Sequence, residues 1–295
     1  MTVTTPPSNF DPVNATNAKL QEYGFPVRPT DASSLADWTT AMASYKSDPA
    51  PPATLKVGSG SAAGDMSTYT TNWAGYSSGV ITAHNHTYVA VKSNYVMPSI
   101  VSGTQLCDYA GPLAFWVGLG GTTSVLNPSD KNNLVQQGVI CGNPFVVGDN
   151  AWRPYTEFAD IGNPVPFCGY GSWTFAPGDT IYQNMGYVTS TNTANFYIED
   201  ETTGVAHGCP GSPPSGWTFD GNTADWESEA SFGLSADFTS INFTNANAEL
   251  GSTGSWVSMG SQSTTKFLDG GCIAPQGINA NQTSFTDKWI QGYCI

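Results

Sequence analysis

Residues 224–248 read ADWESEASFGLSADFTSINFTNANA, in which polar and apolar side chains alternate in two runs. This alternation predicts two β-strands. In the first strand, side chains two residues apart share a face, so Asp225, Glu227 and Glu229 lie on one side and small or apolar residues on the other. Neighbouring carboxylates hinder one another's ionisation and raise at least one pKa. An arrangement with this cost indicates a functional site.

The chain from Thr68 onward has β-strand patterning. Short runs rich in Val, Ile, Tyr, Phe and Trp are separated by Gly, Asn, Ser, Thr and Pro. The predicted strands span residues 87–95, 114–118, 134–140, 152–158, 180–188, 194–199, 224–232, 240–243 and 255–259. Many short strands in a segment of this length predict one all-β domain over residues 67–295, an antiparallel sandwich or barrel.

Residues 1–66 differ from this body. Asp11 can cap a short helix that has Pro12 at its first position, and a second helix is predicted over residues 34–45. Residues 48–64 are rich first in Pro and then in Gly and Ser, which is typical of a flexible linker open to proteolysis. We therefore expect a helical segment and linker ahead of the β domain.

The charge balance limits the possible partners. The chain has 23 acidic and nine basic residues and a formal net charge of −14, which argues against nucleic acid and against anionic membranes. No apolar run reaches the roughly 18 residues of a transmembrane helix. A chain poor in basic residues suits an acidic medium, because protonation of the carboxylates relieves self-repulsion. The same composition would also fit a secreted β protein of any function.

The cysteines and histidines limit which kinds of catalytic or metal-binding site the chain can have. The six cysteines have no metal-binding spacing, and their even number favours disulfides in an exported protein, with 15 pairings left open: Cys107, Cys141, Cys168, Cys209, Cys272 and Cys294. The chain has no H-E-x-x-H and no G-x-S-x-G motif. His84 and His86 could share a strand face, but a solvated loop pair is the stronger interpretation. Carboxylate and amide side chains remain for acid–base chemistry.

Seven motifs follow one another in a fixed order across residues 72–248. They are 72–75 (NWAG), 115–119 (FWVGL), 135–138 (VQQG), 151–158 (AWRPYTEF), 177–181 (PGDTI), 202–204 (TTG) and 224–248. In this order the motifs resemble those of the glutamic peptidases, or eqolisins, which are acid endopeptidases of fungi and some prokaryotes. Each motif alone is weak, and the resemblance rests on all seven in register.

The resemblance implies a fold, a catalytic pair and a mechanism. The fold is a concanavalin-like antiparallel β-sandwich, and the pair carries over to Gln136 and Glu229. Glu229 would act as general base on water and then return the proton to the leaving amine, while the Gln136 amide donates to the oxyanion. A carboxyl of ordinary pKa suits that role in acid. No metal or cofactor is implied; we expect polypeptide substrates, secretion and a monomer.

Further residues receive roles from the same resemblance. Trp73 and Trp116 would line the substrate groove, and Glu157 would assist substrate binding or simply end a strand. Glu227 replaces a family Ile on the face of Glu229, so it competes for the role of base and would raise the pKa of Glu229. Gln136 and Gln137 point to opposite faces of one strand, so only one of them can reach the site.

Two departures and several alternatives stay open. Gly120 and Ile140 each stand where the family has an Asp, so substrate preference and pH optimum should not be copied from fungal members. Residues 1–66 resemble a prosegment removed in acid, with a permanent helical cap as the alternative. The rival functions are a carbohydrate-binding or glycan-cleaving sandwich, whose retaining form needs two carboxyl groups about 5–5.5 Å apart, and an inactive homologue.

Overall fold

The computed structural model describes most of the predicted β domain and a few residues before it. The described residues are 10–11, 13–22, 28, 35, 39, 67–79, 87–101, 107, 113–122, 133–141, 151–158, 165–166, 168, 170, 172–230, 235–261, 264–269 and 272–290. Within them the secondary structure is almost entirely β. The sequence prediction of an all-β domain is confirmed.

Sixteen strands are formed by these residues. Their bounds are β1 (Ser67–Thr71), β2 (Trp73–Gly79), β3 (Tyr88–Val96), β4 (Leu113–Leu119), β5 (Val135–Cys141), β6 (Trp152–Phe158), β7 (Val165–Pro166), β8 (Thr180–Val188), β9 (Thr193–Asp200), β10 (Val205–Gly211), β11 (Thr223–Ala230), β12 (Ile241–Leu250), β13 (Trp256–Ser258), β14 (Thr264–Asp269), β15 (Ile273–Pro275) and β16 (Phe285–Trp289). A short 3-10 helix, η2 (Met259–Ser261), follows β13.

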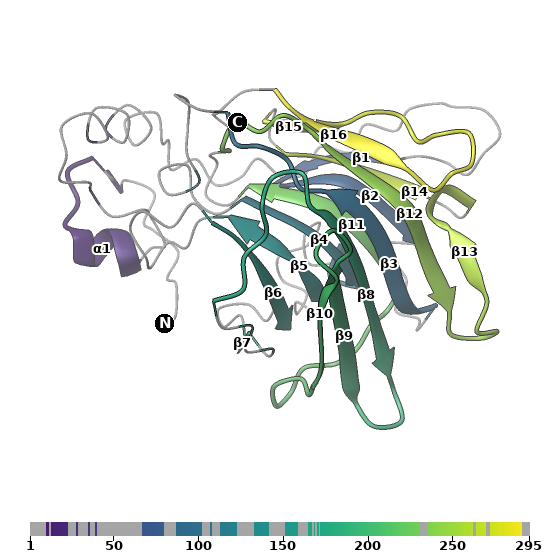
Figure 1. Cartoon of the computed structure of the whole chain (residues 1–295). Helices are drawn as coiled ribbons and strands as arrows, with labels where there is room; N and C mark the ends of the chain where they lie inside the picture. Colours follow the sequence, from purple (N-terminus) through teal and green to yellow (C-terminus); the bar gives the residue numbers. More distant parts are fainter. Residues whose placement is uncertain are drawn as a thin grey trace.

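The strands make two layers that one long strand connects. Sheet A has the order β16-β15-β14-β2-β11-β4-β5-β6-β7, and sheet B has the order β10-β9-β8-β3-β12. The first residues of β12 pair with β16 in sheet A and its later residues pair with β3 in sheet B, so the continuous sheet curls over on itself (Figure 1). All pairs are antiparallel except β1 with β14. The predicted antiparallel β-sandwich is confirmed.

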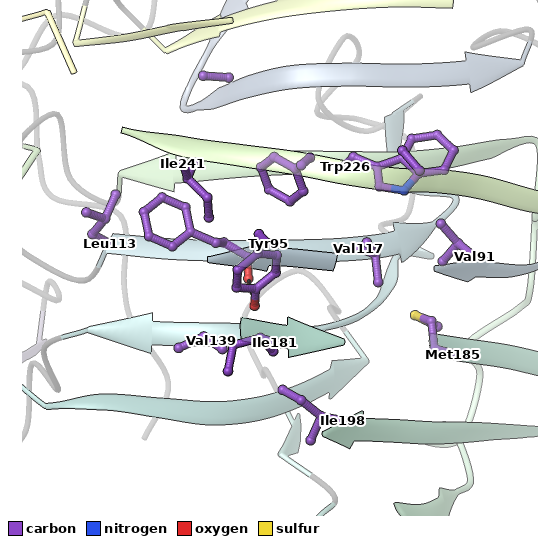
Figure 2. Packing of buried hydrophobic residues seen from close by; sticks show 14 of the residues in the cluster. Val91, Tyr95, Leu113, Val117, Val139, Ile181, Met185, Ile198, Trp226 and Ile241 are labelled. Atoms are coloured by element: carbon purple, nitrogen blue, oxygen red, sulfur yellow. Dashed lines mark hydrogen bonds between the residues drawn. The ribbon is translucent and has the colours of Figure 1, made fainter. Parts of the chain in front are cut away.

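Apolar side chains from the facing surfaces of the two sheets form the main core. Figure 2 shows Trp226 and Val117 of sheet A packed near Tyr95 and Ile181 of sheet B, all fully buried or nearly so. The Trp226 indole N–H donates across the interface to the Lys92 carbonyl at 3.0 Å. Buried indole donors need such a partner, so this bond fixes sheet A against sheet B.

The predicted strand positions agree with the structure to different degrees. Residues 152–158 and 180–188 are strands with the predicted bounds, and most of the other predicted strands differ by one or two residues at an end. The strand predicted at residues 240–243 is an exception, because β12 begins at Ile241 and continues to Leu250. The predictions omit β1, β2, β7, β10, β14, β15 and β16. In β2 the Gly and Ser residues, and in β10 the Gly and Pro residues, hide the strand signal.

The N-terminal segment contributes one described helix, α1 (Asn17–Glu22). The helix begins after Thr16, whose hydroxyl accepts a backbone N–H from the first turn, and Asp11 instead accepts two N–H groups of the preceding turn. The predicted cap at Asp11 is therefore wrong. Leu20 of α1 is fully buried and belongs to the main core cluster. The linker and most of the second predicted helix lie outside the described residues.

Disulfides cross-link the domain as the cysteine count predicts. Cys107 is bonded to Cys141 and Cys168 to Cys209, and Cys272 is also disulfide-bonded. Among the described residues no cysteine is free. No helix in the described part of the chain is long and apolar enough to cross a membrane.

Candidate active site

The predicted site residues gather on the face of sheet A that points away from sheet B, here called the outer face. Strand β11 lies in the middle of this sheet with β2 on one side and β4 on the other, and β5 and β6 follow β4. Because side chains alternate along each strand, the outer face receives the odd-numbered residues of β2 and β11 and the even-numbered residues of β4 and β5.

The strand register arranges these side chains in three rows that run across the sheet. The first row holds Asp225, Gly118, Gln136 and Glu157; the middle row holds Glu227, Trp116, Gly138 and Tyr155; the third row holds Glu229, Ala114, Ile140 and Arg153. The three carboxylates of β11 thus share one face, as the sequence predicts, and each lies in a different row.

Among the three carboxylates of β11, Glu229 accepts the most hydrogen bonds from the described residues. The side chain is partly exposed, and its two oxygens accept from the Asn72 amide at 2.7 Å and the Trp116 indole N–H at 3.1 Å. Burial, followed by the charge of Glu157, raises the pKa of Glu229 to about 7, whereas the bonds from Trp116, Trp73 and Asn72 act in the opposite direction. The ordinary pKa expected from the sequence therefore does not hold.

Trp73 and Trp116 form the apolar floor beside Glu229. Their rings meet edge to face at 4.9 Å, and Trp73 packs in the same way on Phe267. Both indoles are buried, Trp116 completely. Glycines provide the space, because a Cβ on Gly138 would lie 2.6 Å from the Trp116 Cβ. In this structure the two indoles hold Glu229 in place and leave little ring surface for a substrate.

Glu227 and Asp225 lie deeper than Glu229. Both are fully buried, and Glu227 accepts one bond from Ser77 at 3.3 Å while its other oxygen has no partner among the described residues. Burial, then the charges of Asp225 and Asp287, raise the pKa of Glu227 well above its ordinary value. The charge of Glu157 raises the pKa of Glu229, and the charge of Glu229 in turn raises the pKa of Glu227, so the two β11 glutamates are coupled in the direction opposite to the one predicted.

The two adjacent glutamines point to opposite faces. Gln137 is fully buried in the core and donates to the Tyr197 carbonyl of β9. Gln136 is on the outer face, where its amide donates to Glu157 at 3.3 Å and its carbonyl oxygen is buried without a partner among the described residues. Burial raises the pKa of Glu157, and the bond from Gln136 lowers it. Only Gln136 can serve a site on this face.

Gln136 and Glu229 are not neighbours in the sheet. They lie on β5 and β11 with β4 between them, and they occupy the first and third rows. Glu157 connects them, since it accepts from the Gln136 amide and its charge acts on Glu229. The gap between the two rows is the space in which a reacting group would have to lie.

Tyr155 lies in that middle row, and the functional analysis of the sequence did not single it out. Its ring is partly exposed and packs against the Trp73 and Trp116 cluster, and its hydroxyl is buried without a partner among the described residues. Burial, then the charges of Glu229 and Glu157, raise its pKa well above the ordinary value. The alternation in residues 152–158 was the available signal, because it puts Tyr155 on the face of Glu157.

No metal centre is visible in the part of the chain that the structure describes. Among those residues, no group of three or more His, Cys, Asp or Glu side chains is arranged to hold an ion. The described polar and aromatic groups of the outer face are carboxyl, amide, phenol, indole, hydroxyl and guanidinium groups.

Comparison with known proteins identifies the family. The profile of the peptidase A4 family matches residues 71–274. The fold is similar to that of scytalido-glutamic peptidase in complex with a transition-state analogue inhibitor, with a TM-score of 0.53, 17% identity, and coverage of 75% of this chain and 98% of that chain. SCP-B, an eqolisin in complex with the tripeptide Ala-Ile-His, gives a TM-score of 0.50, 18% identity, and coverage of 75% and 98%.

A third solved structure, aspergilloglutamic peptidase from Aspergillus niger, has 22% identity over 61% of this chain and 99% of that chain, with a TM-score of 0.43. No curated protein sequence gives a significant match. The family profile covers well over half of the 295 residues. The chain therefore belongs to the peptidase A4 family, the glutamic peptidases or eqolisins, and is a peptidase.

Proposed function

We propose that this chain is a secreted endopeptidase that hydrolyses polypeptides in acid, with Glu229 as general base and acid and Gln136 as oxyanion donor. The observation that carries the proposal is the environment of Glu229. It is the partly exposed carboxyl of β11, and its oxygens accept from Asn72 and Trp116. A general base must reach water and must be stabilised when ionised, and this environment supplies both conditions.

Glu227 is a poorer candidate for the base. It has no contact with solvent, and Ser77 is its one hydrogen-bond donor among the described residues. Its pKa is raised well above the ordinary value, chiefly by burial, and Ser77 gives the one hydrogen bond that lowers it, whereas three N–H donors lower the pKa of Glu229. The ionised form of Glu227 is therefore less stabilised than that of Glu229, and no water reaches it.

The reaction follows from these roles. The Glu229 carboxylate takes a proton from water as the water oxygen bonds to the peptide carbonyl carbon, and the carbonyl π electrons move to its oxygen. The Gln136 amide, held by Glu157 through one N–H, directs its other N–H to that oxyanion. When the carbonyl re-forms, the C–N bond breaks and Glu229 returns its proton to the leaving amine. No cofactor takes part in these steps.

Two effects of pH oppose each other in this proposal. Because the pKa of Glu229 is raised to about 7, its ionised fraction falls as the pH drops below that value. The buried carboxyls of the same sheet, in contrast, favour their protonated forms, so the fold gains stability in acid. We therefore expect an optimum in moderate acid, above the range of about pH 2–5 that an ordinary Glu pKa would give.

Export and processing complete the proposal. Disulfides persist in oxidising compartments, and the bonds at Cys107 and Cys168 support secretion. Residues 1–66 are proposed to be a prosegment that is cut from the domain at residues 67–295, and the processed enzyme is expected to be a monomer.

The test is digestion of an unfolded polypeptide across the acid and neutral range. We expect cleavage that resists pepstatin and metal chelators and that is lost in both Gln136→Ala and Glu229→Gln, while the core variant Gln137→Leu keeps its turnover number. If Glu229→Gln were active and Glu227→Gln inactive, the general base would be Glu227 and not Glu229. Absence of polypeptide cleavage, with binding or cleavage of polysaccharide instead, would replace the peptidase proposal by the carbohydrate alternative.

A further inference from the structure

The strand register of the outer face determines where a substrate carbonyl would lie between the two proposed catalytic residues. Gln136 is in the first row and Glu229 in the third, four residues apart along the intervening strand β4. A peptide carbonyl whose carbon meets water at Glu229 and whose oxygen meets the Gln136 amide must therefore lie over the middle row. On β5 and β6 this row consists of Gly138 and Tyr155.

Gly138 leaves the space above the middle row open for such a substrate. It carries no side chain, and a Cβ at this position would collide with the Phe115 carbonyl and lie 2.6 Å from the Trp116 Cβ. The neighbouring Trp116 side chain is fully buried. Tyr155, on the next strand, is therefore the polar side chain of this row on the side of Gln136 and Glu157.

The Tyr155 hydroxyl is in an unusual state for a buried polar group. It has no hydrogen-bond partner among the described residues, although its ring is held by the apolar cluster that contains Trp73 and Trp116. A buried donor without an acceptor costs on the order of 1–3 kcal/mol. The charges of both Glu229 and Glu157 act on this phenol, so its O–H lies within the electrostatic field of the proposed site. A ligand oxygen that accepts from Tyr155 would remove the cost.

We propose that Tyr155 is a further catalytic residue, whose O–H donates a second hydrogen bond to the carbonyl oxygen of the scissile peptide. This inference rests on the proposed function. As water adds to the carbonyl carbon and Glu229 takes the water proton, the oxygen that gains the π electrons accepts from the Gln136 N–H and the Tyr155 O–H. Tyr155 keeps its proton throughout, and both hydrogen bonds weaken when the C–N bond breaks and the carbonyl re-forms.

The test uses Tyr155→Phe, which keeps the packed ring and removes only the hydroxyl. Removing one oxyanion donor lowers kcat by roughly 100- to 1000-fold in other enzymes, and we expect a loss of that order with a nearly unchanged KM. A tetrahedral peptide-analogue inhibitor should lose affinity by a similar factor, while a product peptide should bind as before. The melting temperature should stay the same or rise, because the variant removes an unpartnered buried hydroxyl.

Tyr170→Phe is the matched control. Tyr170 is also a tyrosine with a buried hydroxyl, but its ring meets His207 edge to face and Trp173 at a tilt, and neither Glu157 nor Glu229 affects its pKa. Its kcat should equal that of the wild type. Equal kcat losses in both tyrosine variants, or a loss in Tyr155→Phe that appears only in KM, would overturn the role of Tyr155.

The outcomes also separate this inference from the proposed function. Full activity in Tyr155→Phe, with Gln136→Ala and Glu229→Gln inactive, would refute the second donor and leave the catalytic pair standing. A correctly folded and processed wild-type chain that cleaves no polypeptide at any pH would overturn both.

Discussion

The fold should lose stability as the pH rises from about 4 to about 8, and Glu229 should account for a measurable share of the loss. Its folded pKa is about 7 against an ordinary value of 4.5. Between these values the folded chain binds more protons at this site than the unfolded chain. The stabilisation is therefore fully present below pH 4.5 and is lost as the pH rises through 7.

The two pKa values of Glu229 determine the size of this effect. Because one pKa unit corresponds to about 1.4 kcal/mol, the difference between 4.5 and about 7 corresponds to roughly 3 kcal/mol. Asp225, Glu227, Asp269 and Asp287 should add to the loss in the wild type, since burial raises their pKa values well above the ordinary range. The contributions of Asp225 and Asp287 are common to the variants compared below and cancel in the difference, whereas the charge of Glu229 also raises the pKa values of Glu227 and Asp269, so replacing Glu229 removes these couplings as well.

Urea unfolding at about pH 4 and about pH 8 measures this share. The chain should carry Gln136→Ala in all samples, so that self-digestion does not interfere. Adding Glu229→Gln should reduce the difference in unfolding free energy between the two pH values by roughly 3 kcal/mol. Glu201→Gln, which changes an exposed carboxyl, is the matched control. An equal pH dependence with and without Glu229→Gln would refute the reasoning.

Four further outcomes are expected. Glu227→Gln should keep peptidase activity in kinetic assays and lose less stability than the wild type as the pH rises, because its carboxyl is buried with a raised pKa. Gly75→Ala should lower the melting temperature, with a cost of about 1–3 kcal/mol, since the new Cβ would lie 2.6 Å from a Glu227 oxygen. Gln137→Leu should cost roughly 1 kcal/mol in urea unfolding and leave kcat unchanged, because its amide bonds only within the core. Acidifying the purified chain should yield a product cut within residues 47–70 on a gel, and Glu229→Gln should abolish it; a persistent full-length chain with full activity would contradict this.

The sequence was sufficient to predict which side chains share a face. A period of two is a local property, so the alternation alone separated Gln136 from Gln137 and put Asp225, Glu227 and Glu229 together. Register between strands is not local. Nothing in the sequence indicated that β4 lies between β5 and β11, and only this register reveals that Gln136 and Glu229 occupy different rows.

Burial depth was the second property that the sequence could not provide. Glu227 and Glu229 belong to the same run and have the same chemistry, yet the structure buries the first completely and leaves the second partly exposed. Strand β2 contributes to this difference, and the sequence predictions omitted it because WAGYSSG contains few strand-forming residues. Gly75 of β2 provides the space into which the Glu227 carboxyl fits.

The role of each carboxylate is therefore decided by its neighbours across the strands. Opposite Glu227, β2 offers Gly75 and the Ser77 hydroxyl, which can enclose a neutral carboxyl but stabilise a charge poorly. Beside Glu229, the Asn72 amide and the Trp116 indole provide two N–H donors that favour the ionised form. Glu227 therefore holds its proton more firmly than Glu229, whose pKa of about 7 lets it ionise as the pH approaches neutrality. Moderate acid is the range in which Glu227 stays neutral while a fraction of Glu229 is ionised.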